Sequence, residues 1–180
     1  DIHIGPSIDL DDFDEILKLA LLQKPNRVVI TGDLIDKLAW LPQVCERLTT
    51  FAKQIPDGVD FILGNHEYHH DVNKVLDALK RNTPMNILVN SNIQIMGGKQ
   101  PVYIAGVAYD NDREKEKREA MIDKALSGIP DYAFVILLAH HPEFFEESIE
   151  RKIPLTLSGH THGGQIVFMG MPLVPTGTPY

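Results

Sequence analysis

The 180-residue sequence contains a single cysteine, Cys45, and fewer basic than acidic residues, with 17 Lys and Arg against 25 Asp and Glu. A single cysteine excludes an internal disulfide and a thiolate cluster, so any metal site must use nitrogen and oxygen ligands. The formal net charge of −8 argues against a nonspecific nucleic-acid binder, because that binding depends on clustered Lys and Arg. No apolar run approaches the roughly 20 residues that cross a bilayer.

The remaining composition is that of an ordinary globular domain. Hydrophobic residues make up 43% of the chain and charged residues 23%, and a chain of this length buries about 70% of its unfolded surface. We therefore expect a single domain over residues 1–180, with a core that needs no cross-links. Cys45 fits that core as a small buried hydrophobic residue.

Hydrophobic periodicity predicts helices that alternate with short apolar strands. The expected helices cover residues 9–23, 41–54, 72–80, 112–126 and 143–150. The expected strands cover residues 27–31, 59–63, 133–139, 153–157 and 166–169. Residues 86–96 and 102–107 are also β-rich and are joined by a hairpin-like connection. Strands that alternate with helices predict an α/β fold.

Polar side chains gather where the apolar runs end. In open α/β sheets, ligands bind beyond the carboxyl ends of the strands, so these side chains are expected at one rim. They are Asp1, His3, Asp33, Asp36, Asn65, His66, His140, His160 and His162. His160 and His162 are two positions apart, so on an extended segment both rings would point into one cavity.

This set of side chains exceeds what one tetrahedral ion needs. It fits two divalent ions bridged by a carboxylate, an arrangement that holds a phosphoryl group and generates hydroxide at neutral pH. Asp33 follows a central strand and offers two oxygens, so it qualifies as the bridge. Mixed imidazole and carboxylate ligands favour Mn, Fe or Zn over Ca or Mg.

Five ordered motifs resemble those of the calcineurin-like metallophosphoesterase superfamily. They are Asp1-x-His3, Gly32-Asp33-x-x-Asp36, Gly64-Asn65-His66-Glu67, His140-x-Pro142 and Gly159-His160-Thr161-His162. The resemblance implies a β-sandwich flanked by helices in four layers (αββα), with the active site at the carboxyl ends of the strands. Within the superfamily, the chain looks most like small bacterial phosphodiesterases related to YkuE and YaeI, some of whose relatives cleave UDP-diacylglucosamine.

The resemblance also implies a role for each motif residue. One ion would be held by Asp1, His3, Asp33 and His162. The other would be held by Asp33, Asn65, His140 and His160. His66 would lie near the substrate phosphate and stabilise the transition state or protonate the leaving oxygen. Asp36 and Glu67 would orient imidazoles through their ring N–H groups. A hydroxide shared by the two ions would then attack phosphorus in line, without a covalent intermediate.

The expected function is hydrolysis of a phosphodiester or pyrophosphate, and a catalytically inactive protein-binding scaffold of the same fold is the alternative. Every motif position is filled, including His66, which favours the enzyme.

His69, His70 and His141 fall outside the motifs, where packing or surface roles are more common; the first two could also line the substrate cleft. The expected partner is a phosphate-ester substrate, with a nucleotide-sugar lipid as one candidate, and no partner protein is predicted. Membrane association stays open.

The chain begins at Asp1, although this motif aspartate normally ends a buried strand in the family. A free α-ammonium beside a divalent ion would cost about 1–4 kcal/mol in repulsion. We therefore expect a first strand upstream of Asp1 in the parent protein. Further chain is also expected after Tyr180.

Overall fold

The computed structural model describes residues 1–108, 114–162, 167–168 and 171–172. Its helices are α1 (Leu10–Leu22), η1 (Leu38–Trp40), α2 (Leu41–Ala52), α3 (Asn65–His69), α4 (Val72–Asn82), α5 (Lys115–Leu126), η2 (Pro142–Phe144) and α6 (Phe145–Glu150), with η marking 3₁₀ turns. Its strands are β1 (Val28–Ile30), β2 (Val59–Phe61), β3 (Asn86–Ile87), β4 (Ser91–Met96), β5 (Val102–Gly106), β6 (Phe134–Leu138), β7 (Leu155–Leu157), β8 (Val167–Phe168) and β9 (Met171–Pro172).

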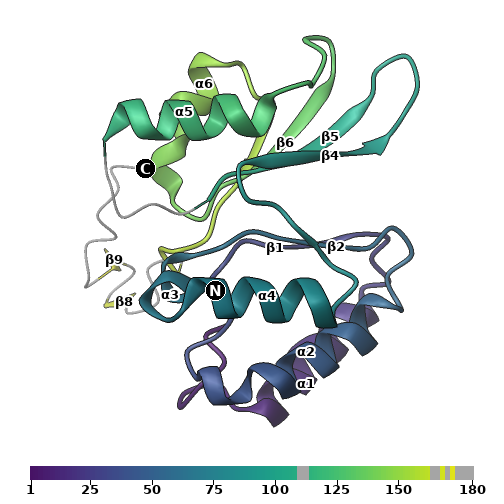
Figure 1. Cartoon of the computed structure of the whole chain (residues 1–180), viewed down its shortest axis with the longest axis vertical. Coiled ribbons are helices and arrows are strands. Elements are labelled where there is room, and N and C mark those ends of the chain that lie inside the picture. Colours follow the sequence, from purple (N-terminus) through teal and green to yellow (C-terminus); the bar gives the residue numbers. More distant parts are fainter. Residues whose placement is uncertain (109–113, 163–166, 169–170, 173–180) are drawn as a thin grey trace.

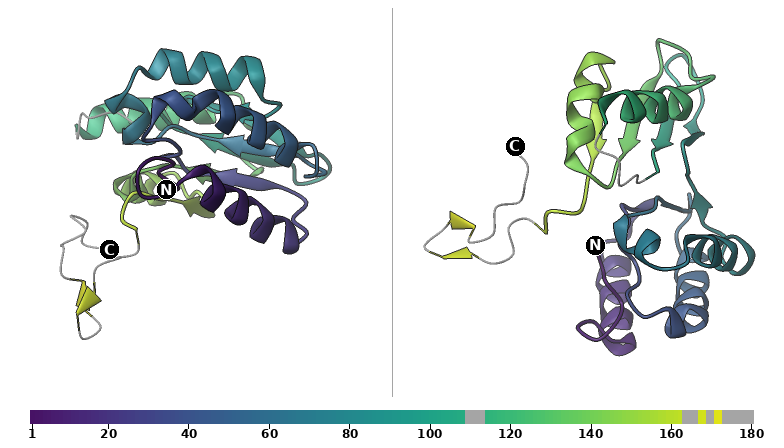
Figure 2. Two further views of the ribbon diagram at one scale, coloured as in Figure 1. Left: turned by 90° about the horizontal axis from the view of Figure 1, so that it is seen from below. Right: turned by 60° about the vertical axis from the view of Figure 1, so that its left-hand side comes forward.

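The first sheet is parallel, with the strand order β1-β2-β3. Helices α1, α2 and α4 lie on one side of it (Figures 1 and 2). Phe13 of α1, Leu48 of α2 and Leu79 of α4 are fully buried in the cluster that also contains Phe61 of β2. Helix α1 begins where the Asp9 carboxylate accepts the N–H groups of the first turn, as expected of an N-cap.

The second sheet has the order β4-β5-β6-β7. Strand β4 runs antiparallel to β5, which confirms a hairpin between the two β-rich runs, and β6 and β7 run parallel to β5. The first run, expected as one unit over residues 86–96, is divided: Asn86–Ile87 is β3 of the first sheet, and Ser91–Met96 joins the hairpin. Helices α5 and α6 cover one face of this sheet, where Ile122 and Phe144 pack against Leu137.

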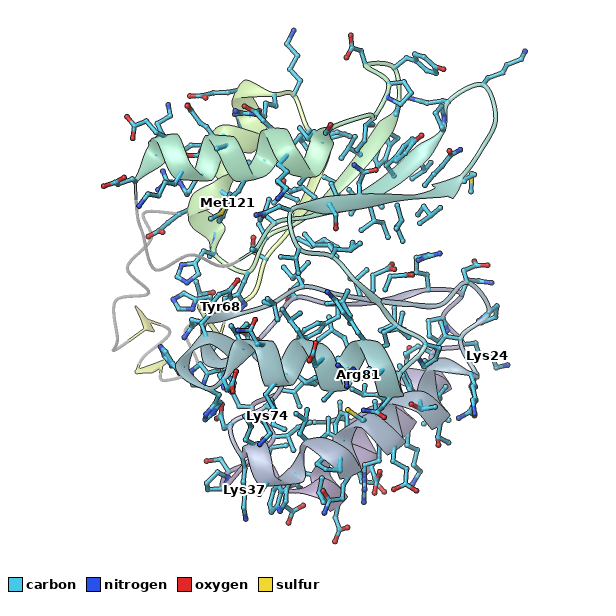
Figure 3. All side chains as sticks on the ribbon, viewed as in Figure 1. Lys24, Lys37, Tyr68, Lys74, Arg81 and Met121 are labelled. Atoms are coloured by element: carbon cyan, nitrogen blue, oxygen red, sulfur yellow. The ribbon has the colours of Figure 1, made fainter. Side chains whose placement is uncertain are left out.

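The two sheets meet in a third apolar cluster. Ile62, Leu88, Ile104 and Leu138 are buried there, and they come from or directly follow strands of both sheets. Side chains fill the space between the sheets as well as between sheets and helices (Figure 3). The layers therefore run helix, sheet, sheet, helix, and the four-layer fold expected from the resemblance is confirmed.

The expected elements are found, with differences at their ends. The strands are shorter than the apolar runs: β1, β2 and β6 end one or two residues before their runs end, and β7 begins two residues after its run begins. Helix α3 was not expected, and it begins at Asn65, four residues after the end of β2. Part of two expected elements, residues 112–113 and residues 166 and 169, lies outside the described residues. Within the described part of the chain, no helix has the length and apolar character needed to cross a bilayer.

Candidate metal centre

The N-terminal segment reaches the rim of the first sheet by pairing with the chain after β1. The backbone N–H groups of Ile2 and His3 donate to the Asp33 carbonyl at 2.8 and 3.0 Å. The segment continues alongside residues 33–36 through an isolated parallel bridge between Ile4 and Ile35. This pairing places Asp1 and His3 beside Asp33, although neither belongs to a strand in the described chain.

One group of side chains forms around His3. Its Nδ1 donates to Asp36 Oδ1 at 3.2 Å, so its Nε2 faces His162 Nε2 at 3.0 Å and Asp33 Oδ2 at 3.6 Å. Asp1 completes the group, with ligand atoms of Asp1, His3 and His162 all within 4.8 Å of one another. The resemblance assigned these four residues to one ion, and the structure brings them together.

A second group forms around His140, whose side chain is completely buried. Its Nδ1 donates to the Thr31 carbonyl at 2.7 Å. Its Nε2 therefore faces Asn65 Oδ1 at 2.9 Å and Asp33 Oδ2 at 3.2 Å. His160 Nδ1 lies 3.0 Å from the same Asn65 oxygen. The four residues assigned to the other ion are thus also adjacent, and Asp33 Oδ2 belongs to both groups.

The donor set fits divalent ions. With the Nδ1 proton of His3 and of His140 donated outward, each ring presents an Nε2 lone pair to oxygens or nitrogens that also carry lone pairs. A cation between them would satisfy these electron pairs. Two ligand atoms held about 2.1 Å from one ion lie about 3.0–3.4 Å apart at octahedral or tetrahedral angles. Four of the distances given above are 2.9–3.2 Å, and the distance from His3 Nε2 to Asp33 Oδ2 is 3.6 Å.

The charge states also suit metal ligands. Burial alone would raise the pKa of Asp33, but its contact with the His140 ring, the hydrogen bond from the His66 backbone N–H and favourable electrostatic interactions with both residues hold that pKa well below its usual range. Burial, followed by repulsion from neighbouring imidazoles, lowers the pKa values of His160 and His162. Near neutral pH the site therefore offers a carboxylate and two neutral imidazoles.

Four of these residues have a left-handed backbone, with φ of 56° at His3, 49° at Asp33, 68° at His160 and 51° at His162. Such values are uncommon outside glycine and cluster at functional sites. Gly32, with φ of 95°, packs so closely that an added Cβ would lie 2.8 Å from the His140 ring. The loops thus turn tightly to bring their side chains inward.

His66 borders the two groups and shares the carboxylate of Asp36 with His3. Its Nδ1 donates to Asp36 Oδ1 at 2.6 Å, and one third of its side chain is exposed. The His69 ring lies 5.1 Å from the His66 ring, between centroids. Asp36 therefore orients two imidazoles, as expected, and leaves Nε2 of His66 available to an incoming ligand.

Comparison with known proteins identifies the family to which these motifs belong. Residues 1–164 match the family described as calcineurin-like phosphoesterase. The chain belongs to this family. Membership implies metal-dependent hydrolysis of phosphate esters, in agreement with the donor set described above.

Curated relatives of this chain carry the same kind of name. An uncharacterized metallophosphoesterase of Campylobacter jejuni is 37% identical over 172 residues, covering 92% of this chain and 43% of that protein. A counterpart in Aquifex aeolicus is 32% identical over 176 residues, covering 94% of this chain and 63% of its own. YkuE of Bacillus subtilis is 28% identical, with coverage of 92% and 57%. The chain therefore spans less than two thirds of the length of these three relatives.

Glu67 departs from expectation. An imidazole partner was expected, but its buried carboxylate accepts backbone N–H groups of Gly64 at 2.7 Å, Leu34 at 2.8 Å and Asp33 at 3.0 Å. The reason is local: Glu67 is the third residue of α3, from which a carboxylate reaches back over the helix start. Burial raises its pKa, and the backbone donors oppose that shift.

The segment carrying His160 and His162 also departs from expectation. Strand β7 ends at Leu157, and both histidines have positive φ, so the alternation of an extended segment does not apply. Their rings instead lie on different sides of the centre, His160 beside Asn65 and His162 beside His3. Gly163, Gly164 and Gln165, which follow in the sequence, lie outside the described residues.

One histidine of the centre was not expected. His141 stacks on His160, and its ligand atoms lie within 4.8 Å of those of His140 and His160. In the sequence, the position of His141 between the motif residues His140 and Pro142 could have indicated that it lies in the centre. No family motif, however, requires a histidine there.

Proposed function

We propose that the phosphoesterase holds two divalent ions bridged by Asp33 and hydrolyses a phosphodiester or pyrophosphate. One observation carries the proposal: Asp33 Oδ2 lies 3.6 Å from His3 Nε2 and 3.2 Å from His140 Nε2, the nitrogens at the centre of the two ligand groups. An oxygen in that position can serve both groups at once. Bound ions would supply Lewis-acid activation of water and charge neutralisation at the phosphoryl oxygens.

His66 and Asp36 would complete the chemistry. The Asp36 carboxylate accepts the Nδ1 proton of His66 and so fixes the ring and its tautomer. The opposite nitrogen, Nε2, can then hydrogen bond to a phosphoryl oxygen or deliver a proton to the leaving oxygen. The same carboxylate also accepts the Nδ1 proton of His3. Asp36 therefore fixes the position of the His66 ring, which would carry the proton, relative to the His3 ring, which would bind the metal.

The exposure of the centre supports a diester or pyrophosphate as the substrate. His66 and Asp36 are 33% and 27% exposed at their side chains, and His162, in the group around His3, is also exposed. A phosphorus atom beside these side chains would have open space around it. A diester or pyrophosphate needs that space, because it carries a group on each side of the reacting phosphorus.

Metal content and hydrolysis together test this function. The purified protein should bind two equivalents of Mn²⁺ or Zn²⁺ and hydrolyse bis(p-nitrophenyl) phosphate faster than p-nitrophenyl phosphate. Asp33→Asn should lose metal and activity together. His66→Ala should keep both ions and lose activity about 100- to 10,000-fold, the usual contribution of a general acid. Asp77→Asn, on the exposed face of α4, is the matched control and should behave as the wild type.

Two outcomes would decide against the proposal. A fully metal-loaded protein that hydrolyses neither ester would be a scaffold with the phosphoesterase fold. One ion per chain in the active wild type would exclude the bridged pair. Turnover of a nucleotide monoester, a cyclic nucleotide and a UDP-sugar lipid, measured side by side, would then separate the substrate classes.

A further inference from the structure

His141 belongs to no motif, yet its ring lies inside the metal centre. The ring centroids of His141 and His160 are 3.7 Å apart and the planes differ by only 27°. The His140 ring meets the same His160 ring at 5.2 Å and 71°. His160 is therefore covered on its face by His141 and approached by the ring of His140.

The stacking of His141 on His160 determines whether His141 can bind the same ion. A ring nitrogen directs its lone pair within the plane of the ring, so the lone pairs of two stacked imidazoles lie in separate, nearly parallel planes and cannot converge on one ion. His160 Nδ1 already faces Asn65 Oδ1 at 3.0 Å. The geometry therefore favours His141 as support for His160 over His141 as an additional ligand.

His160 needs such support because its backbone provides little. It follows the end of β7 and has a φ of 68°, in the left-handed region that L-residues rarely occupy. Its backbone N–H is held by the Asp1 carboxylate at 2.9 Å, but that bond leaves the side-chain torsions free. A ring stacked on the imidazole restricts them.

His141 is itself well placed to act as a fixed surface. Pro142 restricts its backbone to the extended region, where it is found with φ −85° and ψ 130°. Its Nδ1 lies 3.7 Å from Glu143 Oε2, and only 12% of its side chain is exposed. The ring is thus held by its own loop, independently of His160.

We propose that His141 is a positioning residue, which holds the His160 imidazole for the ion assigned to Asp33, Asn65, His140 and His160. This inference rests on the proposed two-ion centre. It adds a residue outside the family motifs to those that set affinity at one of the two ions. It predicts that a ring stacked on His160, and not a metal-binding nitrogen of His141, sets that affinity.

His141→Ala and His141→Phe separate these properties in the full chain. Binding of Zn²⁺ to each metal-free protein is measured by chelator competition, and the coordination of the weaker ion is followed by the visible spectrum of Co²⁺. His141→Ala should bind one ion as the wild type does and the other about 10- to 100-fold more weakly, the usual effect of losing a residue that orients a ligand. His141→Phe, which keeps the stacked ring, should bind both ions nearly normally.

Reference variants set the scale. His160→Ala should weaken the same ion as His141→Ala, His162→Ala should weaken the other ion, and His70→Ala should weaken neither. Thermal melting of the metal-free proteins checks that each variant folds.

Three results would overturn the inference. Equal loss in His141→Phe and His141→Ala would mean that a nitrogen of His141 is required. Wild-type binding by His141→Ala would mean that the stack has no role. One ion in the wild type would remove both this inference and the two-ion centre. Two ions without any hydrolysis would remove the proposed function alone.

Discussion

At the scale of single residues, several proposed ligands have backbone conformations that favour glycine. Glycine cannot replace them, because it has no side chain to bind a metal. His3, Asp33, His160 and His162 adopt positive φ, at a cost of order 1–3 kcal/mol each. Their side chains are the proposed ligands, so the strain must be offset by contacts with neighbouring loops. The Glu67 carboxylate is one such contact, because it accepts the Asp33 N–H.

Glu67→Gln should therefore destabilise the metal-free protein by about 1–3 kcal/mol, the usual cost of leaving a buried group unsatisfied. The amide nitrogen would replace one of the two accepting oxygens, so its N–H groups would face either the Gly64 and Asp33 donors or the Leu34 and Ile35 donors. Urea unfolding of the variant and the wild type measures the difference.

Glu46→Gln on the exposed side of α2 is the control for this exchange and should change stability by less than about 0.5 kcal/mol. If the two variants unfold at the same urea concentration, the backbone contacts of Glu67 do not stabilise the loops.

At the scale of elements, periodicity was sufficient for long helices and buried strands. The stripe from Leu10 to Leu21 indicated α1 because its apolar residues recur at helical spacing. Helix α3 has five residues, three of them site residues of the motif, so it has no apolar stripe to find. The left-handed turns were equally invisible, because they are imposed by tertiary contacts and not by turn-forming residues such as Gly or Asn.

The end of α1 offers a test at this scale. Lys24 follows the C-cap Gln23, donates its N–H to the Leu21 carbonyl at 2.9 Å and has a φ of 50°; it lies at the edge of the molecule (Figure 3). Glycine is preferred at this helix position. Lys24→Gly should raise the free energy of unfolding by about 0.5–1 kcal/mol, because relief of the left-handed strain exceeds the added chain entropy.

Lys53→Gly is the matched control at the end of α2. Lys53 is equally exposed but has right-handed values, φ −65° and ψ −16°, so glycine brings only the entropic cost of about 0.5–1 kcal/mol. The two substitutions should shift the urea midpoint in opposite directions, and a shift of the same sign would refute the backbone explanation.

At the scale of the whole molecule, the centre joins the two sheets. Asp33 and Asn65 follow strands of the first sheet, and His140 and His160 follow strands of the second. The motifs predicted which residues meet, because their order along the chain resembles that of the family. The resemblance also assigned His160 and His162 to different ions, and their rings lie beside Asn65 and beside His3 respectively. Which atoms face each other depends on loop conformations that periodicity does not encode.

Metal binding should consequently stabilise the entire fold. An ion that binds only the folded state at 100 times its dissociation constant adds about 2.7 kcal/mol, which is about 5–10 °C in Tm for a chain of this size. Thermal melting with added Zn²⁺ or Mn²⁺, compared with a chelator, measures the effect. Asp33→Asn should show a much smaller response, and an unchanged Tm in the wild type would contradict ligation across the two sheets.

The distribution of ligands along the chain also orders events during synthesis. Asp1, His3, Asp33 and Asn65 lie in the first 65 residues, but each proposed ion also needs a histidine from residues 140–162. A nascent chain that exposes only the first sheet therefore has incomplete sites for both ions. We therefore expect stable metal binding only after the second sheet has emerged from the ribosome. Bound metal would then indicate that both sheets have been synthesised.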